Sequence, residues 1–452
     1  MQSRSTPPAQ LHRARRFWWV ARMVVVIYSG YKWIQLLEKL RGTEAVLDHY
    51  RRHHRRSAEI AYDTATRLHG LLIKACQFLG TRADILPRVY VEVLSQLHDR
   101  VPARSTEEIS AAVEAELGRP LGEVFASFDA LPLASASLAQ VHRACLHDGR
   151  EVAVKVQYPE IADIVAVDLA NFRFFVGILA RIERNFDLRM VIREVSKYVQ
   201  LELDFENEAR NSKTIRANLA ARSDVVVPAI VDELSTRRLL VMEYLPGIKI
   251  TDVEALEATG IDKQEVARVL SEVFCQQILV DGFFHADPHP GNLLVRPGPQ
   301  LVLLDFGLAK DFPPGFSQQM AALTMAIIAQ DRDAMARAFA DLGFKTKNDD
   351  PESLIALGDA FLGQAVRSGK AYADKELIDT FNEDLPEVLR TNPIVEAPSH
   401  LLLVVRVMGL LSGIGKQLRS EVNPLSVIMP FLAGSLPPGD AKPDPRAVGE
   451  SS

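Results

Sequence analysis

Apolar positions in the first third of the chain follow the spacing of helices. Between residues 43 and 117, hydrophobic side chains recur at steps of three and four residues, for example at Ile60, Leu68, Leu71, Leu72 and Ala75. This spacing places them on one face of a helix, because an α-helix has 3.6 residues per turn. The pattern therefore predicts a helical region ahead of any sheet.

The pattern then changes to small residues followed by an alternation that is typical of strands. Val141 and Cys145 alternate with polar residues, Asp148-Gly149 indicates a turn, and apolar residues return over 152–156. These signals predict a β-hairpin that follows a small-residue loop. Short side chains let backbone N–H groups and hydroxyls approach a phosphate closely, so the loop is a candidate phosphate-binding segment. Its residues are Ala134, Ser135, Ala136 and Ser137.

Later segments extend both kinds of structure. Residues 225–231 and 238–243 have the short apolar runs of strands, whereas 191–218 and 263–283 are predicted to be helices. Beyond residue 310 the chain is mainly helical. The sequence therefore predicts a mixture of helices and sheet, with most of the strands in its middle third.

The composition is that of a folded protein with a large core. A length of 452 residues and a hydrophobic content of 48% allow two or three domain-sized units. Two apolar runs near the C-terminal end are interrupted by Arg406 and Pro430, so they are predicted to be core helices and not membrane spans. Three widely spaced cysteines without a CxxC pair argue against a disulfide framework or a zinc site, and they indicate a reducing cytosolic compartment.

Charge is distributed unevenly along the chain. Residues 1–56 contain 12 Lys and Arg against 3 Asp and Glu, a net charge of +9, so the rest carries −15 and the total is −6. After a polar lead over residues 1–12, which is predicted to be disordered, apolar and aromatic residues 17–28 lie beside several arginines. This is typical of a helix at an anionic membrane surface and not of a nucleic-acid-binding tail. The alternative is a helix packed on the protein's own surface.

The same basic arm is unlike two other kinds of N-terminal segment. Its apolar run is short and interrupted by Arg22, which argues against a transmembrane helix. It also lacks a small-residue cleavage site, which argues against a signal peptide. A cytoplasmic protein that is peripheral to the membrane is the resulting expectation.

Residues with catalytic chemistry concentrate in the segment 283–310. Asp287 precedes Asn292 by five residues, and Asp305 opens an Asp-Phe-Gly triplet 18 residues after Asp287. This spacing is that of a kinase catalytic loop and its metal-binding loop. Short strands around Pro297-Gly298-Pro299 would form a hairpin that brings Asn292 beside Asp305. Because Mg²⁺ prefers oxygen ligands, these two residues are predicted to bind it, while Asp287 orients or deprotonates an acceptor.

Lys155 ends the strand sequence Val-Ala-Val-Lys, a pattern that places a kinase lysine against the α- and β-phosphates of ATP. Such a lysine needs an anionic partner, which the predicted helix over residues 191–218 can provide. The segment after strand 238–243 corresponds to the connection between kinase lobes, so the Glu243 carbonyl and the Leu245 amide are expected to contact adenine. The candidate partners of the lysine are Glu202, Asp204, Glu206 and Glu208.

With these residues placed, the chain resembles the UbiB (AarF-domain) family of atypical kinases across roughly residues 65–432. Three features carry the resemblance, and ordinary protein kinases lack them. The features are a KxGQ-type element at Lys74 to Gln77 followed by LSQLHDRVP, the Ala-rich loop ASASLAQVH in place of a Gly-rich one, and Glu202-Leu203-Asp204.

The resemblance implies an α+β, two-lobed protein-kinase-like fold with an N-terminal helical extension across the cleft. It also implies ATP and Mg²⁺ as cofactors. By position, Lys155 contacts phosphates and pairs with Glu208, Asp287 is the catalytic aspartate, and Asn292 and Asp305 bind Mg²⁺. The family-motif residues are Lys74 and Gln77, with Glu202 and Asp204 forming an acidic motif near Lys74.

The expected organisation has five parts. A basic, partly amphipathic arm precedes a helical extension that contains the KxGQ-type element, and two kinase lobes and a disordered tail follow. The expected borders are 1–42 for the arm, 43–120 for the extension, 121–245 for the N-lobe, 246–434 for the C-lobe and 435–452 for the tail.

Two departures from the family pattern bear on function. Cys76 occupies the glycine position of the KxGQ-type element, where its Cβ and sulfur would disturb close packing over the nucleotide. After Asp305-Phe306-Gly307 the chain has no long activation segment and no Ala-Pro-Glu, so a docking platform for protein substrates is expected to be missing.

Two functions from different classes follow. The first is an atypical kinase or ATPase that binds Mg-ATP and couples its turnover to prenyl-lipid or quinone-related metabolism at a membrane surface. The second is a catalytically weak pseudokinase scaffold whose nucleotide binding regulates recruitment of lipid-pathway enzymes. Retention of Lys155, Glu208, Asp287, Asn292 and Asp305 together favours the enzyme. Prenyl-lipid or quinone precursors and an anionic membrane are the expected partners besides ATP, without nucleic acid.

Overall fold

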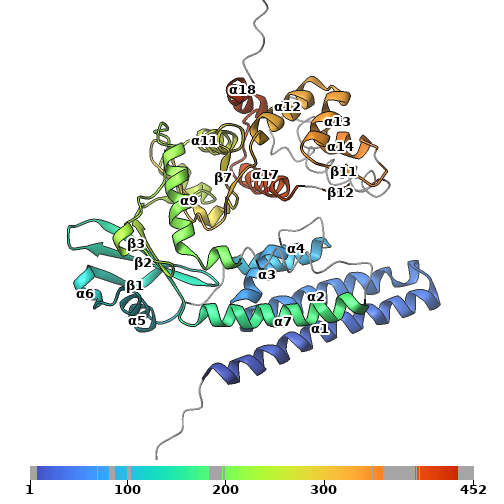
Figure 1. Ribbon diagram of the computed structural model, residues 1–452, viewed down its shortest axis with the longest axis horizontal. Helices are drawn as coiled ribbons and strands as arrows, with labels where there is room; N and C mark the ends of the chain where they lie inside the picture. The colour runs from blue at the N-terminus through green and yellow to red at the C-terminus, as the bar shows by residue number, and fades with distance from the viewer. Residues whose placement is uncertain are drawn as a thin grey trace, which may run out of the picture. The chain divides into compact units, whose positions relative to one another are not determined.

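Contacts divide the chain into two compact units, each with helices and a β-sheet (Figure 1). Unit 1 comprises residues 1–209 and 229–244, and unit 2 comprises residues 210–228 and 245–452. The mixture of helix and sheet confirms the predicted α+β class. The computed structural model describes residues 8–68, 70–80, 87–98, 103–182, 196, 199–348, 350–359, 392, 394–396 and 398–435.

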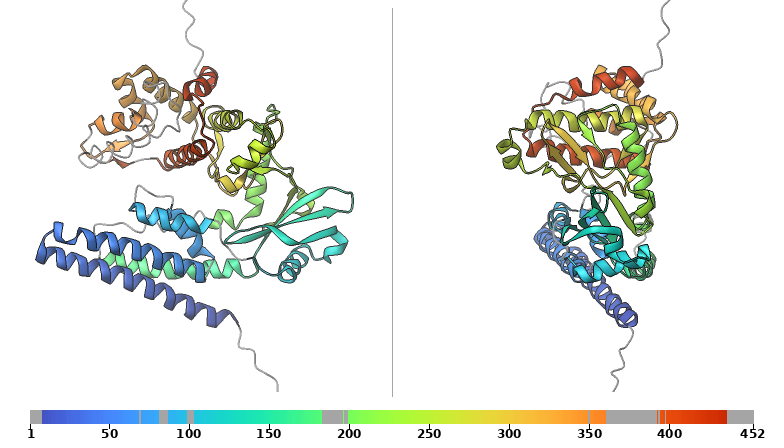
Figure 2. Two further views of the ribbon diagram at one scale, coloured as in Figure 1. Left: turned by 180° about the vertical axis from the view of Figure 1, so that it is seen from behind. Right: turned by 90° about the vertical axis from the view of Figure 1, so that its left-hand side faces the viewer.

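The N-terminal part of unit 1 is helical, as the spacing predicts. Helices α1 (Pro8–Arg41), α2 (Leu47–Leu68) and α7 (Ile161–Ile182) run side by side (Figures 1 and 2). The shorter helices α3 (Leu71–Gly80) and α4 (Arg88–Leu94) pack on them. All five contribute to one apolar core, whose buried members include Val20, Ala65, Leu72, Cys76, Leu94 and Phe175.

Helix α1 is joined to α7 by a buried ion pair. The Arg16 Nε donates to Asp168 Oδ1 over 2.7 Å, and a second guanidinium nitrogen also contacts this carboxylate. The neighbouring Phe17 ring stacks on Phe175 with 5.2 Å between centroids. One face of α1 therefore packs on its own unit. Because the helix begins at Pro8, the predicted disordered lead is wrong for residues 8–12; proline is tolerated in a first helical turn.

The sheet of unit 1 has the strand order β1-β2-β3-β5, with all neighbours antiparallel. The predicted hairpin is confirmed as β2 and β3, which are joined through Gly149 at a φ of +88°. Helix α5 (Thr106–Leu117) packs against the sheet, and the short helix α6 (Leu121–Val124) precedes β1. The strands are β1 (Phe125–Ser135), β2 (Ala139–Leu146), β3 (Glu151–Gln157) and β5 (Leu239–Glu243).

The helix predicted over residues 191–218 is interrupted. Helix α9 spans Phe205–Asn218, and the backbone leaves helical conformation at Leu203 and Asp204. The Asp204 carboxylate accepts from the Asn207 amide over 3.0 Å, which is the bond of a helix N-cap. Gln157 donates to the Leu203 carbonyl over 2.9 Å. The prediction of one continuous helix is therefore wrong, and residues 191–195 lie outside the described part.

Unit 2 contains a second four-stranded sheet, of order β4-β9-β8-β6. The hairpin predicted around Gly298 is confirmed. The strand predicted over residues 225–231 is wrong in length, because β4 has only two residues and pairs in parallel with β9. Pro228 lacks the N–H that a longer ladder would need. The strands are β4 (Val225–Val226), β6 (Ile248–Lys249), β8 (Leu293–Arg296) and β9 (Gln300–Leu303).

Helix α11 leads into the candidate catalytic loop. It spans Lys263–Gln276, continues as a π-helical turn over Gln277–Asp281 and ends at Gly282, which has a φ of +68°. The predicted helix reaches Phe283, but that residue opens strand β7 (Phe283–His285), which pairs with β10 (Ala309–Asp311). Gly282 ends the helix in the left-handed conformation. Glycine adopts this conformation without a steric clash because it has no Cβ.

The remaining elements of unit 2 are mainly helical. Both interrupted apolar runs are helices, α17 and α18, as predicted. Among the described residues, no helix combines the length and the apolar character needed to cross a membrane. The elements are α10 (Val253–Ala258), α12 (Phe316–Ala329), α13 (Arg332–Asp341), β11 (Lys345–Thr346), α14 (Glu352–Gly358), β12 (Ile394–Glu396), α17 (Ser399–Gln417) and α18 (Pro424–Ser435).

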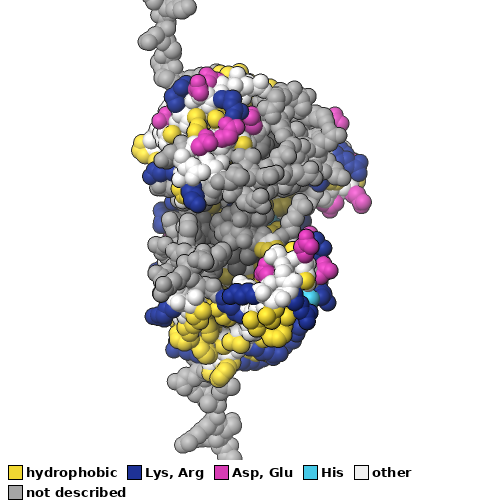
Figure 3. Space-filling model, turned by 90° about the vertical axis from the view of Figure 1, so that its right-hand side faces the viewer, with side chains coloured by type: hydrophobic (Ala, Val, Ile, Leu, Met, Phe, Trp, Pro, Cys, Tyr) yellow, Lys and Arg dark blue, Asp and Glu magenta, His cyan; other side chains and the backbone are white. Residues whose placement is uncertain are grey.

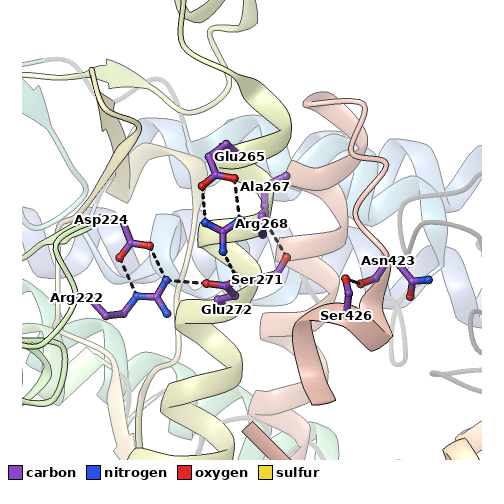
Figure 4. A network of polar contacts seen from close by, with 9 residues as sticks. All are labelled: Arg222, Asp224, Glu265, Ala267, Arg268, Ser271, Glu272, Asn423 and Ser426. Atoms are coloured by element: carbon purple, nitrogen blue, oxygen red, sulfur yellow. Dashed lines mark hydrogen bonds and ion pairs between the residues drawn. The ribbon is translucent and has the colours of Figure 1, made fainter. Parts of the chain in front are cut away.

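A charged network fixes the segment between α9 and β4 against α11 (Figure 4). Arg222 binds the Asp224 carboxylate over 2.7 Å and Glu272 over 2.9 Å. Arg268 forms ion pairs with Glu265 and Glu272, so Glu272 is shared by two guanidinium groups. The network holds residues 222–224 against α11, in agreement with the assignment of residues 210–228 to unit 2.

Asp281, next to the catalytic segment, gives the fold a pH dependence. One carboxylate oxygen lies 3.5 Å from the Gln276 amide, and the other has no hydrogen-bond partner among the described residues. Burial raises the pKa of Asp281 to about 6. Because this folded-state pKa exceeds the unfolded value, Asp281 makes the protein less stable as pH rises from about 4 to 6.

We therefore predict that Asp281→Asn stabilises the protein at pH 7.5. The expected gain is about 1–2 kcal/mol after allowance for the partial exposure of the carboxylate, and it should vanish near pH 4. Thermal unfolding across this pH range measures it, with Asp311→Asn at an exposed site as the control. A gain that persists at pH 4 would contradict the titration.

Candidate active site

The central charged contact in unit 1 joins Lys155 to Glu208. The Lys155 ammonium lies 2.7 and 2.8 Å from the two carboxylate oxygens of Glu208. Glu208 is 2% exposed and the lysine side chain 12%. Of the four acidic residues that the sequence offered as partners, the structure thus brings Glu208 to this lysine. A pair so well shielded from water holds both side chains in one geometry.

The start of α9 positions Glu208. Asp204 caps the helix, and the Phe205 amide donates to the Arg237 carbonyl over 3.0 Å. The Phe205 ring is buried, and its centroid lies 5.1 Å from the Lys155 ammonium. The break at residues 203–204 thereby determines where the first turn of α9 begins and which side of it faces β3.

A second ion pair joins the two family-motif segments. Lys74 on α3 contacts the Glu202 carboxylate. Cys76 points elsewhere, because its side chain is only 5% exposed and belongs to the apolar core of the helical region. The disturbance of nucleotide packing expected from Cys76 is therefore not supported by its position. The side chain of Gln77 lies outside the described part, although its backbone is within α3.

The small-residue loop is shorter than predicted. Ala134 and Ser135 are part of β1 and pair with Val141 and Gln140, so the connection to β2 is a tight turn over residues 136–138. The Ala136 amide donates to the Ala139 carbonyl over 2.8 Å. The Ser135 hydroxyl is bonded to the Tyr158 hydroxyl at 2.8 Å, and Ser137 is buried. A phosphate-binding role for this turn stays a prediction.

The two residues predicted to contact adenine lie at the border of the units. Glu243 ends β5, and its amide donates to the Ala229 carbonyl over 2.8 Å. Its carboxylate accepts from the Ala229 amide over 3.2 Å, so this side chain braces the connecting segment. Leu245 is buried. Their contacts with a nucleotide also stay a prediction.

In unit 2 the hairpin β8–β9 brings the predicted catalytic and metal-binding residues together. The Leu304 amide donates to the Asn292 carbonyl over 2.8 Å, which places Asn292 beside the residue before Asp305. The Asn292 side-chain amide donates to the Asp287 carbonyl over 3.3 Å. Asp305 has a φ of +54°, and its carboxylate accepts from the Gly307 amide over 3.2 Å. A non-glycine residue in this backbone region is uncommon and is often found at functional sites.

His285 also supports this arrangement through its hydrogen bonds. It is not among the residues predicted from the sequence. It is fully buried, and its Nδ1 accepts from the Asp287 amide over 3.1 Å. Its Nε2 lies 3.2 Å from the Leu304 carbonyl. Burial lowers the pKa of His285, so the ring is neutral and Nε2 is the donor. A histidine at the end of a strand, two residues before Asp287, was the available signal.

The Asp-Phe-Gly segment is fixed by its own neighbours. Phe306 is buried, and its ring centroid lies 5.4 Å from that of His285. Asn211 of α9 donates to the Phe306 carbonyl over 2.8 Å, a contact that sequence reasoning also missed. Helix α12 already begins at Phe316, so the short connection expected in place of an activation segment is present.

Arg406 of α17 contacts the predicted catalytic aspartate. Its Nη2 lies 2.9 Å from Asp287 Oδ1, with the two side chains 18% and 24% exposed. In the sequence, Arg406 stands out only as an interruption of an apolar run. That interruption was itself the signal, because a charge within an apolar helix needs a specific partner.

Comparisons with known proteins agree with these features. A family model described as the ABC1 atypical kinase-like domain matches residues 96–339. AarF domain-containing protein kinase 1 of Gallus gallus is 33% identical over 386 residues, which cover 83% of this chain and 73% of the relative. The protein of the same name from Xenopus tropicalis is 40% identical over 283 residues, covering 62% and 54%. ACTIVITY OF BC1 COMPLEX KINASE 7, chloroplastic, of Arabidopsis thaliana is 32% identical over 379 residues, covering 83% and 54%.

A solved structure supports the fold. The Rv3197–erythromycin complex from Mycobacterium tuberculosis matches with a TM-score of 0.65 at 24% sequence identity, covering 85% of this chain and 97% of that one. The fold is therefore protein-kinase-like. The chain belongs to the ABC1 (AarF-domain) atypical kinase-like family. It spans between about half and three quarters of the length of the three curated relatives.

The shielded pair makes a stability prediction. Glu208→Ala would leave the Lys155 ammonium in a poorly hydrated position, so we expect a loss of about 3–5 kcal/mol. The double variant Lys155→Met, Glu208→Leu removes both charges and should recover most of that loss. Urea unfolding of the full chain measures both effects. A loss below about 1 kcal/mol in Glu208→Ala would contradict the prediction, because it would show that water solvates these charges in the folded protein.

Proposed function

We propose that this protein is an atypical kinase or ATPase that binds Mg-ATP and couples its turnover to prenyl-lipid or quinone-related metabolism at a membrane surface. The observation that carries the proposal is the arrangement of Asp287, Asn292 and Asp305, which one hairpin and its hydrogen bonds hold together. The kinase-like family supports the use of ATP. The lipid pathway rests on the resemblance to UbiB proteins.

The donor atoms of unit 2 fit a magnesium ion. The Asn292 amide nitrogen donates to the Asp287 carbonyl, so the amide oxygen is the atom that would bind a cation. Asp305 supplies a carboxylate that the Gly307 amide orients. Oxygen ligands of this kind suit Mg²⁺, which when bound neutralises phosphate charge. In unit 1, Lys155 would bind phosphate oxygens while Glu208 holds its ammonium in position.

Asp287 is the residue proposed to orient or deprotonate the acceptor. Its amide is held by His285 and its carbonyl by Asn292, so its backbone is fixed on both sides. The short connection from Gly307 to α12 supports a small-molecule or lipid acceptor, or water, in preference to a protein substrate.

One observation favours the second candidate, a nucleotide-regulated scaffold. The ion pair with Arg406 engages an oxygen of Asp287 that a catalytic base would use. In a scaffold this contact would be permanent, whereas in an enzyme the aspartate must also serve the acceptor. ATP turnover by Asp287→Asn separates the two candidates.

Nucleotide binding gives the first prediction of this proposal. Mg-ATP at about one hundred times its dissociation constant should stabilise the protein by about 2.7 kcal/mol. Thermal unfolding with and without Mg²⁺ measures this, and Asp305→Asn should abolish the metal-dependent part. Asp311→Asn at an exposed site should leave it unchanged.

The catalytic part has its own readout. Asp287→Asn should retain the Mg-ATP stabilisation and lose at least a hundredfold in ATP turnover, because positioning and proton transfer of this kind contribute about 10²–10⁴ in rate. Turnover at the wild-type rate in Asp287→Asn would favour the scaffold.

Helix α1 supports the membrane part of the proposal. Its exposed apolar residues recur on one side, within an arc of about 80° at 100° per residue, opposite the buried Val20 and Ile34. Trp18 is 71% exposed and Trp33 61%. Figure 3 shows apolar side chains gathered beside Lys and Arg in the lower part of the view. The exposed members are Trp18, Val25, Trp33, Leu36 and Leu40.

A surface of this kind is expected to enter a lipid interface while its basic neighbours bind anionic headgroups. We predict reversible binding to vesicles that contain phosphatidylserine, which weakens as salt rises. The double variant Trp18→Glu, Trp33→Glu should reduce binding at least tenfold in co-sedimentation. Leu131→Glu, at an 83% exposed position on β1, is the matched control. Equal losses in both variants, or salt-independent binding, would count against α1 as the contact.

A further inference from the structure

Unit 2 contains an apolar cavity whose volume is about 190 Å³. Its walls come from α11, α12, α17 and α18, with further side chains from α13 and α14. Protein interiors seldom contain voids larger than a water molecule, which needs only about 10–15 Å³. The cavity is also partly open to solvent, so apolar side chains of these helices are left in contact with water.

The walls of the cavity offer almost nothing to a polar ligand. None of the lining side chains that the structure describes is charged. The Ser271 hydroxyl donates to the Ala267 carbonyl over 2.8 Å, as Figure 4 shows, and the Thr324 hydroxyl donates to the Met320 carbonyl over 2.7 Å. A polar group placed here would lose its hydrogen bonds to water without replacement. The walls of the cavity therefore favour a hydrocarbon ligand.

Helix α17 separates the cavity from the candidate catalytic loop. Its residues Val404, Met408, Leu411 and Gly415 follow one another at steps of three and four and line the cavity. Arg406 projects from the opposite side of the helix, about 140–180° away from these residues, and contacts Asp287. The cavity is thus a site of its own, although it shares a helix with the catalytic loop.

We propose that this cavity binds a hydrocarbon chain, either the acyl chain of a lipid or an isoprenoid chain, and leaves the polar end of the molecule outside. Sites for whole small molecules usually have about 300–1,000 Å³, so the cavity fits a segment of a chain. The proposal deepens the lipid part of the proposed function, but binding itself requires neither nucleotide nor the catalytic residues.

The experiment uses the purified full chain without nucleotide and the fluorescent fatty acid cis-parinaric acid as the probe. We expect saturable emission with one probe per chain, and displacement by palmitate, by farnesol or by both. Displacement by palmitate identifies an acyl chain and displacement by farnesol an isoprenoid. Emission that does not saturate, or that neither competitor reduces, would overturn the proposal.

Two neighbouring positions on α17 provide a matched pair of variants. Ser412 lines the cavity, whereas Gly413 is exposed and a Cβ added there meets no atom within 4 Å. Ser412→Phe should fill the cavity and weaken probe binding at least tenfold, while Gly413→Phe should not change it. Equal binding by both variants would assign the probe to another surface, such as α1, and overturn the proposal.

Two further measurements keep the outcome interpretable. Ser271→Leu fills the same cavity from α11, so it replaces Ser412→Phe if the latter does not fold. Thermal stabilisation by Mg-ATP is measured on each variant, and we expect the cavity-filling variants to retain it. Loss of probe binding with retained Mg-ATP stabilisation therefore locates the hydrocarbon site, whereas absent Mg-ATP stabilisation in every variant contradicts only the proposed function.

Discussion

The Lys155–Glu208 ion pair is the constraint on which the arrangement of β3 and α9 in unit 1 depends. Removing an ammonium and a carboxylate from water is costly, so the two groups have to meet with good geometry. In this fold the helical conformation is interrupted at residues 203–204, and Asp204 caps the start of α9. The backbone bond of Phe205 to Arg237 then fixes the helix start against the sheet. Two adjacent residues thereby determine the position of an acidic side chain one helical turn later.

Unit 2 uses a different device for its acidic residues, because they lie in loops. Here backbone hydrogen bonds of the hairpin fix Asn292 beside Leu304, and the buried His285 is bonded to both the Asp287 amide and the Leu304 carbonyl. One neutral side chain thus connects the two loops that contain the predicted catalytic and metal-binding residues. Helix α17 lies beside these loops. One side of it carries Arg406, which pairs with Asp287, and the other side lines the apolar cavity.

The sequence predicted best those parts of the molecule that short-range chemistry determines. Both hairpins form where Asp148-Gly149 and Pro297-Gly298-Pro299 supply turn residues. The spacing of Asp287, Asn292 and Asp305 predicted a segment whose residues hydrogen bonds hold together in the structure. The errors fall where tertiary contacts decide. The break before α9 depends on hydrogen bonds with the Gln157 side chain and the Arg237 carbonyl. The ion pair of Arg406 with Asp287 forms only because the fold places α17 beside the catalytic-loop candidate. A cavity between four helices has no local pattern at all.

The thiol of Cys76, at a family-motif position, is made unreactive by burial. Burial raises the pKa of its thiol to about 12, so at pH 7 only about one molecule in 100,000 carries the nucleophilic thiolate. The sulfur lies among the apolar side chains of the N-terminal helices and is shielded there from oxidants and alkylating reagents. The substitution of glycine by cysteine therefore adds packing volume without adding redox sensitivity, and modification of this thiol requires the helical core around it to open.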